Sequence, residues 1–264
     1  MIRRAILAAC IAFPMMAQTT TIQPSGSASA TETRTFALQS GGRLKISSIS
    51  GDVSVSAWDK DEVALTASFK PNGNGEHMRI DVESDKYLLE LIVKIQESNL
   101  QKITVGSCDI ELKVPRQILS NINIVNGKVK LDAITGESIT NVVNGNIVFE
   151  NTNGNINGSV VNGNITGSIH NIDVDLNLST VSGDIKVELL NPNGNLRASS
   201  VTGSVKIPSG VKNVTNDEKK IESLVIPSGV RFLTEKNVAT KFDGNAYMKF
   251  RTVNGSIIIS IPGF

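Results

Sequence analysis

The chain has 264 residues, with 26 basic and 25 acidic side chains and a formal net charge of +1. This balance provides no field that would steer nucleic acid or an anionic membrane to the surface. Aromatic residues make up only 4% of the sequence, so the core must be built from Val, Ile and Leu, which is typical of stacked parallel strands. The length is compatible with two small domains or with one long all-β domain.

Residues 1–17 have the features of a secretory signal peptide. Arg3 and Arg4 form a basic start, and the apolar stretch 5–13 is too short to span a bilayer. We therefore expect an exported chain, periplasmic or at the cell surface, with no transmembrane segment after cleavage. The Leu-Ala-Ala-Cys sequence that ends at Cys10 looks like a lipobox, which would make Cys10 a lipid anchor. The apolar run before Cys10 is short for that role, so simple cleavage is favoured.

Two segments precede the repeats. Residues 18–33 are rich in Thr, Ser, Ala and Gln, which predicts a flexible linker. From Arg34 onward apolar and polar residues alternate with the period of two that is typical of strands. Residues 34–118 have longer strands and more charged connections than the sequence that follows. We predict a β-rich N-terminal cap there, which includes a first rung and covers the open edge of a strand stack.

A five-residue phrase recurs along the chain: a small or β-branched residue, a polar residue, Gly, a polar residue and an aliphatic one. The sequence Val-Asn-Gly-Asn-Ile of residues 143–147 is an example. Asn126, Asn144 and Asn162 are 18 residues apart, and Asn153 falls midway between the last two. Two half-rungs of nine residues therefore make one rung, which predicts an all-β fold of the parallel β-solenoid type, a single-stranded β-helix.

The solenoid is expected over residues 119–264, with one interruption. Residues 208–252 contain two Pro-Ser-Gly turns, a charged stretch and several aromatic residues, which predicts an irregular excursion. The repeat phrase then returns once, from Val253 to Ile261.

The Asn-Gly pairs are expected at the corners between short strands. Gly reaches positive φ without a steric cost, and Asn tolerates the same region and can form hydrogen-bonded amide ladders between rungs. We predict that the following residues form a structural corner ladder: Asn126, Gly127, Asn144, Gly145, Asn153, Gly154, Asn162, Gly163, Gly183, Gly194, Gly203 and Gly255.

Several phrases occur in a distinctive order. Gly-Gly-Arg-Leu-Lys-Ile at 41–46 is followed by Ile-Ser-Gly-Asp-Val at 49–53, Ala-Trp-Asp-Lys-Asp-Glu-Val at 57–63 and Leu-Lys-Val-Pro at 112–115. With the later Ser-Gly-Asp and Asn-Gly-Asn rungs, this order resembles the bacterial putative-adhesin family known as domain of unknown function 4097, over about residues 34–264. The resemblance implies an exported β-helix-like repeat protein with a suggested role in adhesion, and it supplies no catalytic residues. This chain differs from the family pattern in carrying Asn where Asp is favoured and in its long C-terminal excursion.

The residues that usually bind metals or act as nucleophiles are sparse. His77 and His170 lie far from each other in sequence and from any cluster of ligands, so no metal or other cofactor is expected. His77 is expected in a solvent-facing loop and His170 at a rung or turn position. Cys108 is the one cysteine left after signal cleavage, and we expect a small buried apolar residue rather than a reactive thiol.

One arrangement of carboxylates keeps an enzymatic alternative open. Asp173 and Asp175 alternate onto one face, and Asp184 on the next rung could join them, as a polysaccharide lyase or hydrolase built on a β-helix would require. However, Asp184 occupies the slot that Asn holds in other repeats, which favours a turn role. Asp173 and Asp175 are expected on a solvated strand face.

The sequence thus predicts a non-enzymatic, exported repeat protein that acts as an adhesin or as an envelope structural or interaction protein. Its expected partner is a glycan or an envelope or surface protein, contacted by Asn and Thr side chains spread over the rungs. The alternatives are the β-helix lyase or hydrolase and a self-assembling envelope scaffold, since a rod of parallel rungs with weak caps can join end to end.

Overall fold

The structure is a computed structural model that describes residues 17–24, 29–71, 78–95, 106–172, 175–206, 236–241 and 246–262. Residues 1–16 of the predicted signal peptide, which include Cys10, lie outside these described residues, as do the loop that contains His77, Asp173 and most of the predicted excursion.

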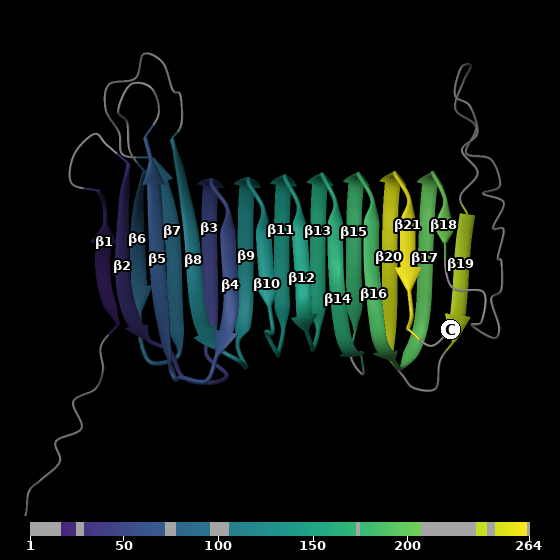
Figure 1. Cartoon of the computed structure of the whole chain (residues 1–264), viewed down its shortest axis with the longest axis horizontal. Helices are drawn as coiled ribbons and strands as arrows, with labels where there is room; N and C mark the ends of the chain where they lie inside the picture. The colour runs from purple at the N-terminus through teal and green to yellow at the C-terminus, as the bar shows by residue number, and fades with distance from the viewer. Residues whose placement is uncertain are drawn as a thin grey trace, which may run out of the picture.

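All the secondary-structure elements in the described residues are β-strands, and they form two large, mostly parallel sheets (Figure 1). The 11 strands of the first sheet, which we call sheet A, are in spatial order β1 (Gln18–Ile22), β6 (Met78–Ser84), β7 (Leu88–Ile95), β3 (Arg43–Ser50), β9 (Leu119–Asn126), β11 (Ser138–Asn144), β13 (Ile156–Asn162), β15 (Leu176–Ser182), β20 (Ala246–Asn254), β17 (Gly194–Thr202) and β19 (Lys236–Lys241).

The 10 strands of the second sheet, sheet B, are in spatial order β18 (Val205–Lys206), β21 (Ile257–Ser260), β16 (Ile185–Pro192), β14 (Ile165–Ile172), β12 (Ile147–Thr152), β10 (Val129–Asp132), β4 (Val53–Trp58), β8 (Ser107–Pro115), β5 (Glu62–Lys70) and β2 (Ala30–Ala37). The prediction of an all-β fold is confirmed.

The middle of the molecule is built from sequential rungs, each made of one strand in sheet A and the next strand in sheet B. From β9 to β16 the chain alternates between the sheets, and each new strand pairs in parallel with the strand two before it. The register keeps equivalent residues together, so that Ile124 lies beside Val142 and Val142 beside Val160. The 18-residue period of the sequence is therefore one full rung of two strands.

The N-terminal region contains a first rung, β3 and β4, and three further strands in each sheet. β7 and β8 continue the parallel stack, whereas β6 and β1 in sheet A and β5 and β2 in sheet B are added as antiparallel strands. β1 and the first half of β2 lie within residues 18–33, where the sequence predicted a flexible linker. Backbone pairing to the edge of an existing sheet explains this difference, because a strand that is added in this way needs few apolar side chains. In β1 the buried residue is Ile22, and the other four are exposed.

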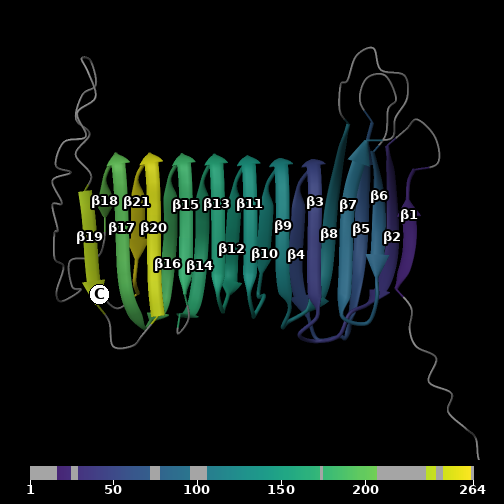
Figure 2. The same ribbon diagram turned by 180° about the vertical axis from the view of Figure 1, so that it is seen from behind.

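The C-terminal rung interrupts the sequential order. β20 and β21 lie between the rung of β15 and β16 and the rung of β17 and β18, so the last rung in sequence is the penultimate one in space (Figure 2). Residues 246–252, predicted as part of the excursion, instead belong to the regular strand β20. β19 pairs antiparallel with β17 and is the last strand of sheet A.

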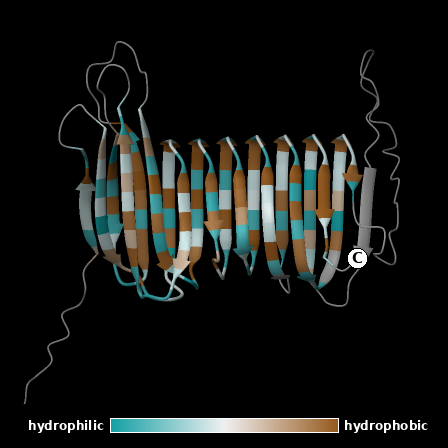
Figure 3. Cartoon of the chain, in the orientation of Figure 1, coloured by the Kyte–Doolittle hydropathy of each residue, from teal (hydrophilic) through white to brown (hydrophobic). Residues whose placement is uncertain are grey.

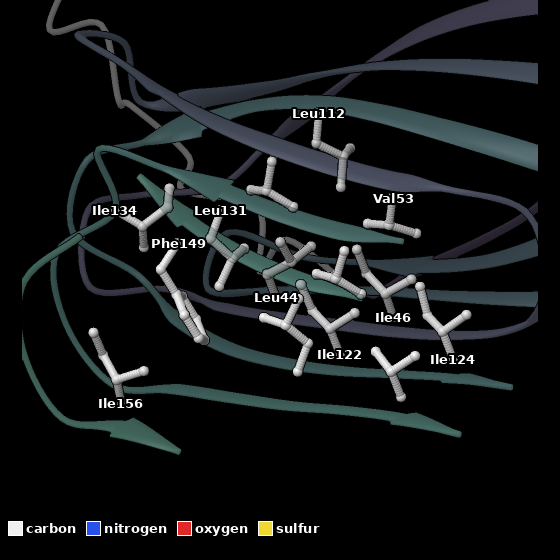
Figure 4. Packing of buried hydrophobic residues seen from close by; sticks show 14 of the residues in the cluster. Leu44, Ile46, Val53, Leu112, Ile122, Ile124, Leu131, Ile134, Phe149 and Ile156 are labelled. Atoms are coloured by element: carbon white, nitrogen blue, oxygen red, sulfur yellow. The ribbon is translucent and has the colours of Figure 1, made fainter. Parts of the chain in front are cut away.

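Apolar and polar residues alternate along the strands (Figure 3). The apolar residues of this alternation are buried and form the core. In Figure 4, Leu44, Ile46 and Ile122 of sheet A point toward Val53 and the other core residues of sheet B. Aliphatic side chains fill this narrow interior, and hydroxyl residues such as Thr140 and Thr252 are also buried in it.

Cys108 is fully buried, and burial raises the pKa of its thiol to about 12. The thiol is therefore neutral at physiological pH, as expected for a small core residue.

In the part of the chain that the structure describes, no helix has the length and apolar character needed to cross a membrane.

Candidate functional surface

The corner at which each strand of sheet A turns toward sheet B contains a stacked column of glycines. Their φ angles lie between +124° and +155°. In spatial order these residues are Gly51, Gly127, Gly145, Gly163, Gly183, Gly255 and Gly203. A Cβ at Gly145 would overlap the carbonyl oxygen of Gly127, and the same holds for each successive pair. Glycine is therefore required by positive φ and by the close stacking of backbones.

Two predicted corner glycines lie elsewhere. Gly154 stacks on Gly136 at the opposite corner of the rung, where Asn153 bridges to Thr135. This arrangement agrees with the half-rung spacing. Gly194 is the first residue of β17 and lies beside Ala246 of β20, so it occupies a strand rather than a corner. The corner of that rung is made by Gly203.

The Asn residues before the glycines form an amide ladder at this corner. The Nδ2 atom of Asn144 donates to Oδ1 of Asn126 at 3.0 Å, and Nδ2 of Asn162 donates to Oδ1 of Asn144 at 2.9 Å. Asn126 in turn donates to the carbonyl oxygen of Ile49 at 3.4 Å. The amide ladder ends where Ser182 replaces Asn on the next rung.

A second ladder is formed by the residues that follow the glycines. Oδ1 of Asn146 accepts from the backbone N–H of Asn164 at 2.8 Å, and Oδ1 of Asn164 accepts from that of Asp184 at 2.8 Å. Oδ1 of Asp184 then accepts from the backbone N–H of Ser256 at 2.7 Å. Asp184 therefore has the same structural role as the Asn residues in its repeat slot.

The structure separates two members of the proposed acidic face, Asp175 and Asp184. Asp175 precedes β15 and Asp184 follows it, so at about 3.3 Å per residue the strand separates them by roughly 20 Å. Glycosidase carboxylates lie within about 10 Å of each other. Oδ1 of Asp175 accepts from the backbone N–H of Tyr247 at 3.0 Å, which is again a contact between rungs. Asp173 lies outside the described residues.

The outward face of sheet A carries further amide columns that the repeat phrase did not reveal. Asn141 of β11 donates to Asn123 of β9 at 2.9 Å, and Asn123 donates to Asn121 within the same strand at 2.9 Å. Farther along the sheet Asn177 donates to Asn157 at 3.1 Å. Their outward positions in adjacent, in-register strands could have been found by aligning whole 18-residue rungs rather than the corner phrase alone.

An exposed aliphatic column runs beside these amides. It consists of the first residue of six repeat phrases, with exposed fractions of 37–46%: Ile49, Val125, Val143, Val161, Val181 and Val253. The sequence analysis treated this position only as part of the repeat. The apolar column and the amide columns lie next to each other on a single face.

Ionisable groups outside the corners form surface pairs. At the N-terminal end of sheet A, Nζ of Lys94 lies 2.8 Å from Oδ2 of Asp81, and Nε of Arg79 lies 3.3 Å from its Oδ1. The hydrogen bond from Lys94, with the charge of Arg79, lowers the pKa of the Asp81 carboxyl.

His170 lies in β14 beside Leu190 of β16, the predicted rung position. Among the described residues no group of three or more His, Cys, Asp or Glu side chains is arranged to hold a metal ion.

The family assignment from the sequence is confirmed by comparison with known families. Residues 39–226 match the model of the family described as Toastrack DUF4097, so the chain belongs to this family. The C-terminal rung of β20 and β21 lies outside the matched residues. A comparison with curated proteins gives no match.

Solved structures with a related arrangement share little sequence with this chain. A "putative cell adhesion protein" from Clostridium sporogenes ATCC 15579 is 12% identical, with a TM-score of 0.42, and covers 88% of this chain and 100% of that one. A "putative adhesin" from Bacteroides fragilis NCTC 9343 is 12% identical, with a TM-score of 0.32, over 88% and 97% of the two chains. A "putative lipid binding protein" from Parabacteroides distasonis ATCC 8503 is 11% identical, with a TM-score of 0.24, over 88% and 95%.

Proposed function

We propose that this chain is an exported, non-enzymatic interaction protein, an adhesin or envelope structural protein, that contacts a surface partner through the outward face of sheet A. The proposal includes winding of the chain as a single-stranded β-helix and a location in the periplasm or at the cell surface. The observation that carries it is the pair of amide contacts between neighbouring rungs, Asn141 with Asn123 and Asn177 with Asn157. These contacts fix polar groups at the spacing of the strands, about 4.8 Å, over an extended face.

A distributed polar face of this kind suits a repetitive or extended partner. Hydrogen bonds between neighbouring amides hold the side chains in place, so little side-chain entropy is lost when a partner binds. A glycan chain and an envelope or surface protein are the two partners that this chemistry fits. The low aromatic content offers few stacking platforms for sugar rings, which weakens the glycan version.

The enzymatic alternative, a β-helix lyase or hydrolase, has less support. Asp175 and Asp184 are far apart, and each carboxylate accepts a backbone hydrogen bond from another rung. The scaffold alternative requires stacking at the ends. Sheet A ends in the antiparallel strands β1 and β19, which do not continue the parallel pattern of the middle.

The test is a binding and turnover screen of the chain against bacterial and host polysaccharides and envelope fractions, with detection of cleaved products. Retention without cleavage, weakened by Asn141→Asp and Asn123→Asp on the outward face, supports the proposal. Cleavage that is lost in Asp175→Asn or Asp184→Asn would establish the enzymatic alternative. The matched control is Lys186→Asp on the outward face of sheet B, where a new carboxylate should leave binding unchanged.

A further inference from the structure

A groove crosses the outward face of sheet A near the N-terminal end of the stack. Its volume is about 520 Å³, and its lining is mostly apolar. The groove is lined by the aliphatic column from Ile49 through Val125 and Val143 to Val161, and by Ile92 of β7. A groove of this size lies in the range of small-molecule sites, about 300–1,000 Å³.

The groove exists because two strands of sheet A separate. The pairing of β7 with β3 ends at Ile92 and Ser47, although β3 continues along β9 as far as Ser50. Later rungs join sheet A to sheet B through a two-residue corner, whereas residues 96–106 separate β7 from β8. The exposed side of Ile49 therefore faces the groove rather than a neighbouring strand.

The charge at the end of the groove that β7 lines is positive. Lys94 lines the groove, and its side chain is 48% exposed. Its ammonium and the guanidinium of Arg79 share the single carboxylate of Asp81, so two cations face one anion. The residues that line the groove include no carboxylate.

The shape and chemistry of the groove suit a narrow apolar chain better than a folded protein surface. The apolar wall is one side chain wide and crosses four rungs at about 4.8 Å per strand. On its polar side, Asn123 and Asn141 are hydrogen-bonded to each other. A stable protein interface buries about 800 Å² on each partner, far more than this single column presents.

We propose that this groove binds a single-chain anionic amphiphile. The alkyl chain lies along the column from Ile49 to Val161, and the anionic head group lies beside Lys94. The groove shares Asn123 and Asn141 with the face proposed above, but the two proposals are tested with different ligands and different substitutions, so either can fail without the other.

The test is calorimetric titration of the full chain with dodecyl phosphate below its micelle concentration, alongside dodecanol and dodecyltrimethylammonium. Saturable one-to-one binding is expected for dodecyl phosphate, with a negative heat-capacity change from apolar burial. Dodecanol should bind more weakly, and the cationic probe should bind weakest.

Variants separate the groove from the rest of the aliphatic column. Val143→Asp in the groove should weaken dodecyl phosphate binding by roughly tenfold or more, because it places a charge against the alkyl chain. Val181→Asp is the matched control, since Val181 belongs to the same column but lies outside the groove. Lys94→Gln should weaken dodecyl phosphate several-fold and leave dodecanol unchanged. Val125→Thr, a milder change, replaces Val143→Asp if that chain does not fold.

Three results would overturn the proposal: no saturable binding, equal losses in Val143→Asp and Val181→Asp, or equal affinity for the cationic and anionic probes. A dimer in light scattering that Val143→Asp dissociates would instead assign the groove to contact with a second copy, and would also contradict the amphiphile site.

Discussion

The middle rungs and the C-terminal rungs are built from the same repeat, but the chain passes through them in different orders. From β9 to β16 each rung is added to the one before it in sequence. At the C-terminal end the rung of β20 and β21 lies between two rungs that are consecutive in sequence. The glycine column passes through both regions without a break, from Gly183 to Gly255 to Gly203. Local rung chemistry thus specifies how rungs stack, but not which rung occupies a given place.

The largest expected effect concerns the core of the inserted rung. Phe250 of β20 and Phe149 of β12 are both fully buried. Phe250→Ala and Phe149→Ala should each lower the free energy of unfolding by about 3–5 kcal/mol, because each leaves a large cavity. Chemical denaturation measures both losses. A much smaller loss for Phe250→Ala would show that the inserted rung is not part of the cooperative stack.

Hydrogen exchange sharpens the same comparison. Phe250→Ala should increase amide exchange in β17, whose parallel partner is β20, more than in β13. Phe149→Ala should have the opposite distribution. Equal changes in β13 and β17 for both variants would mean that the two regions open as one unit.

Substitutions in the glycine column should lower the free energy of unfolding by similar amounts in both regions, and by slightly less than the Phe substitutions do. Gly145→Ala and Gly255→Ala should each cost at least about 2–3 kcal/mol, because the new Cβ overlaps a backbone carbonyl and the φ angle is unfavourable. Gly41→Ala is the matched control, since Gly41 has a φ of +79° but no neighbouring atom within 4 Å of the position that a Cβ would take. It should cost about 1–2 kcal/mol, from the backbone conformation alone. Thermal unfolding of the three variants separates the cost of the backbone conformation from the cost of the overlap between the new Cβ and the carbonyl oxygen. Equal losses of stability in all three variants would contradict the close stacking.

The amide ladder predicts a smaller difference between the regions. Asn144 donates to one neighbouring Asn and accepts from another, whereas the side-chain oxygen of Asn254 accepts from the hydroxyl of Thr202. Asn144→Ala should cost about 1 kcal/mol and Asn254→Ala about half as much, since both sites are exposed. Denaturation midpoints measure the difference. A larger loss of stability for Asn254→Ala than for Asn144→Ala would mean that the amide ladder makes no measurable contribution to stability.

The smallest expected effect is at the junction of the two regions. Asp184 accepts a backbone hydrogen bond from Ser256, and the neighbouring rung uses Asn164 in the same way. Asp184→Asn should therefore change stability by less than about 0.5 kcal/mol, whereas Asp184→Ala should cost about 1 kcal/mol. A large loss for Asp184→Asn would show that the negative charge itself matters there.

The sequence predicted the rung but not the order of all the rungs. The 18-residue spacing of Asn126, Asn144 and Asn162 predicted the period and the corner, because positive φ and amide stacking leave a strong local pattern. The inserted rung has the same residue pattern as its neighbours. Met248 of β20 lies beside Leu176 of β15 and Leu196 of β17, and all three are apolar core residues. Periodicity alone cannot distinguish such equivalent places in the stack.

Two other features depend on edges, which leave little mark on a sequence. β1 and β2 are polar strands held mainly by backbone pairing to β6 and β5, so their composition resembled that of a linker. The groove beside Ile49 arises where β7 leaves β3, and the amide columns of its polar side become visible only when strands are placed in register.

The most direct test of the interleaved stack is disulfide formation between outward positions of sheet A. Ser179 of β15 lies beside Arg251 of β20, whereas Ser199 of β17 is one strand farther away. Adjacent parallel strands are about 4.8 Å apart, which suits a disulfide, while two strand spacings exceed its reach of about 7 Å. In a chain with Cys10→Ser, the pair Ser179→Cys and Arg251→Cys should crosslink under mild oxidation, and the pair Ser179→Cys and Ser199→Cys should not. Crosslinking of the second pair instead of the first would show that the rungs stack in sequence order, and would contradict the account.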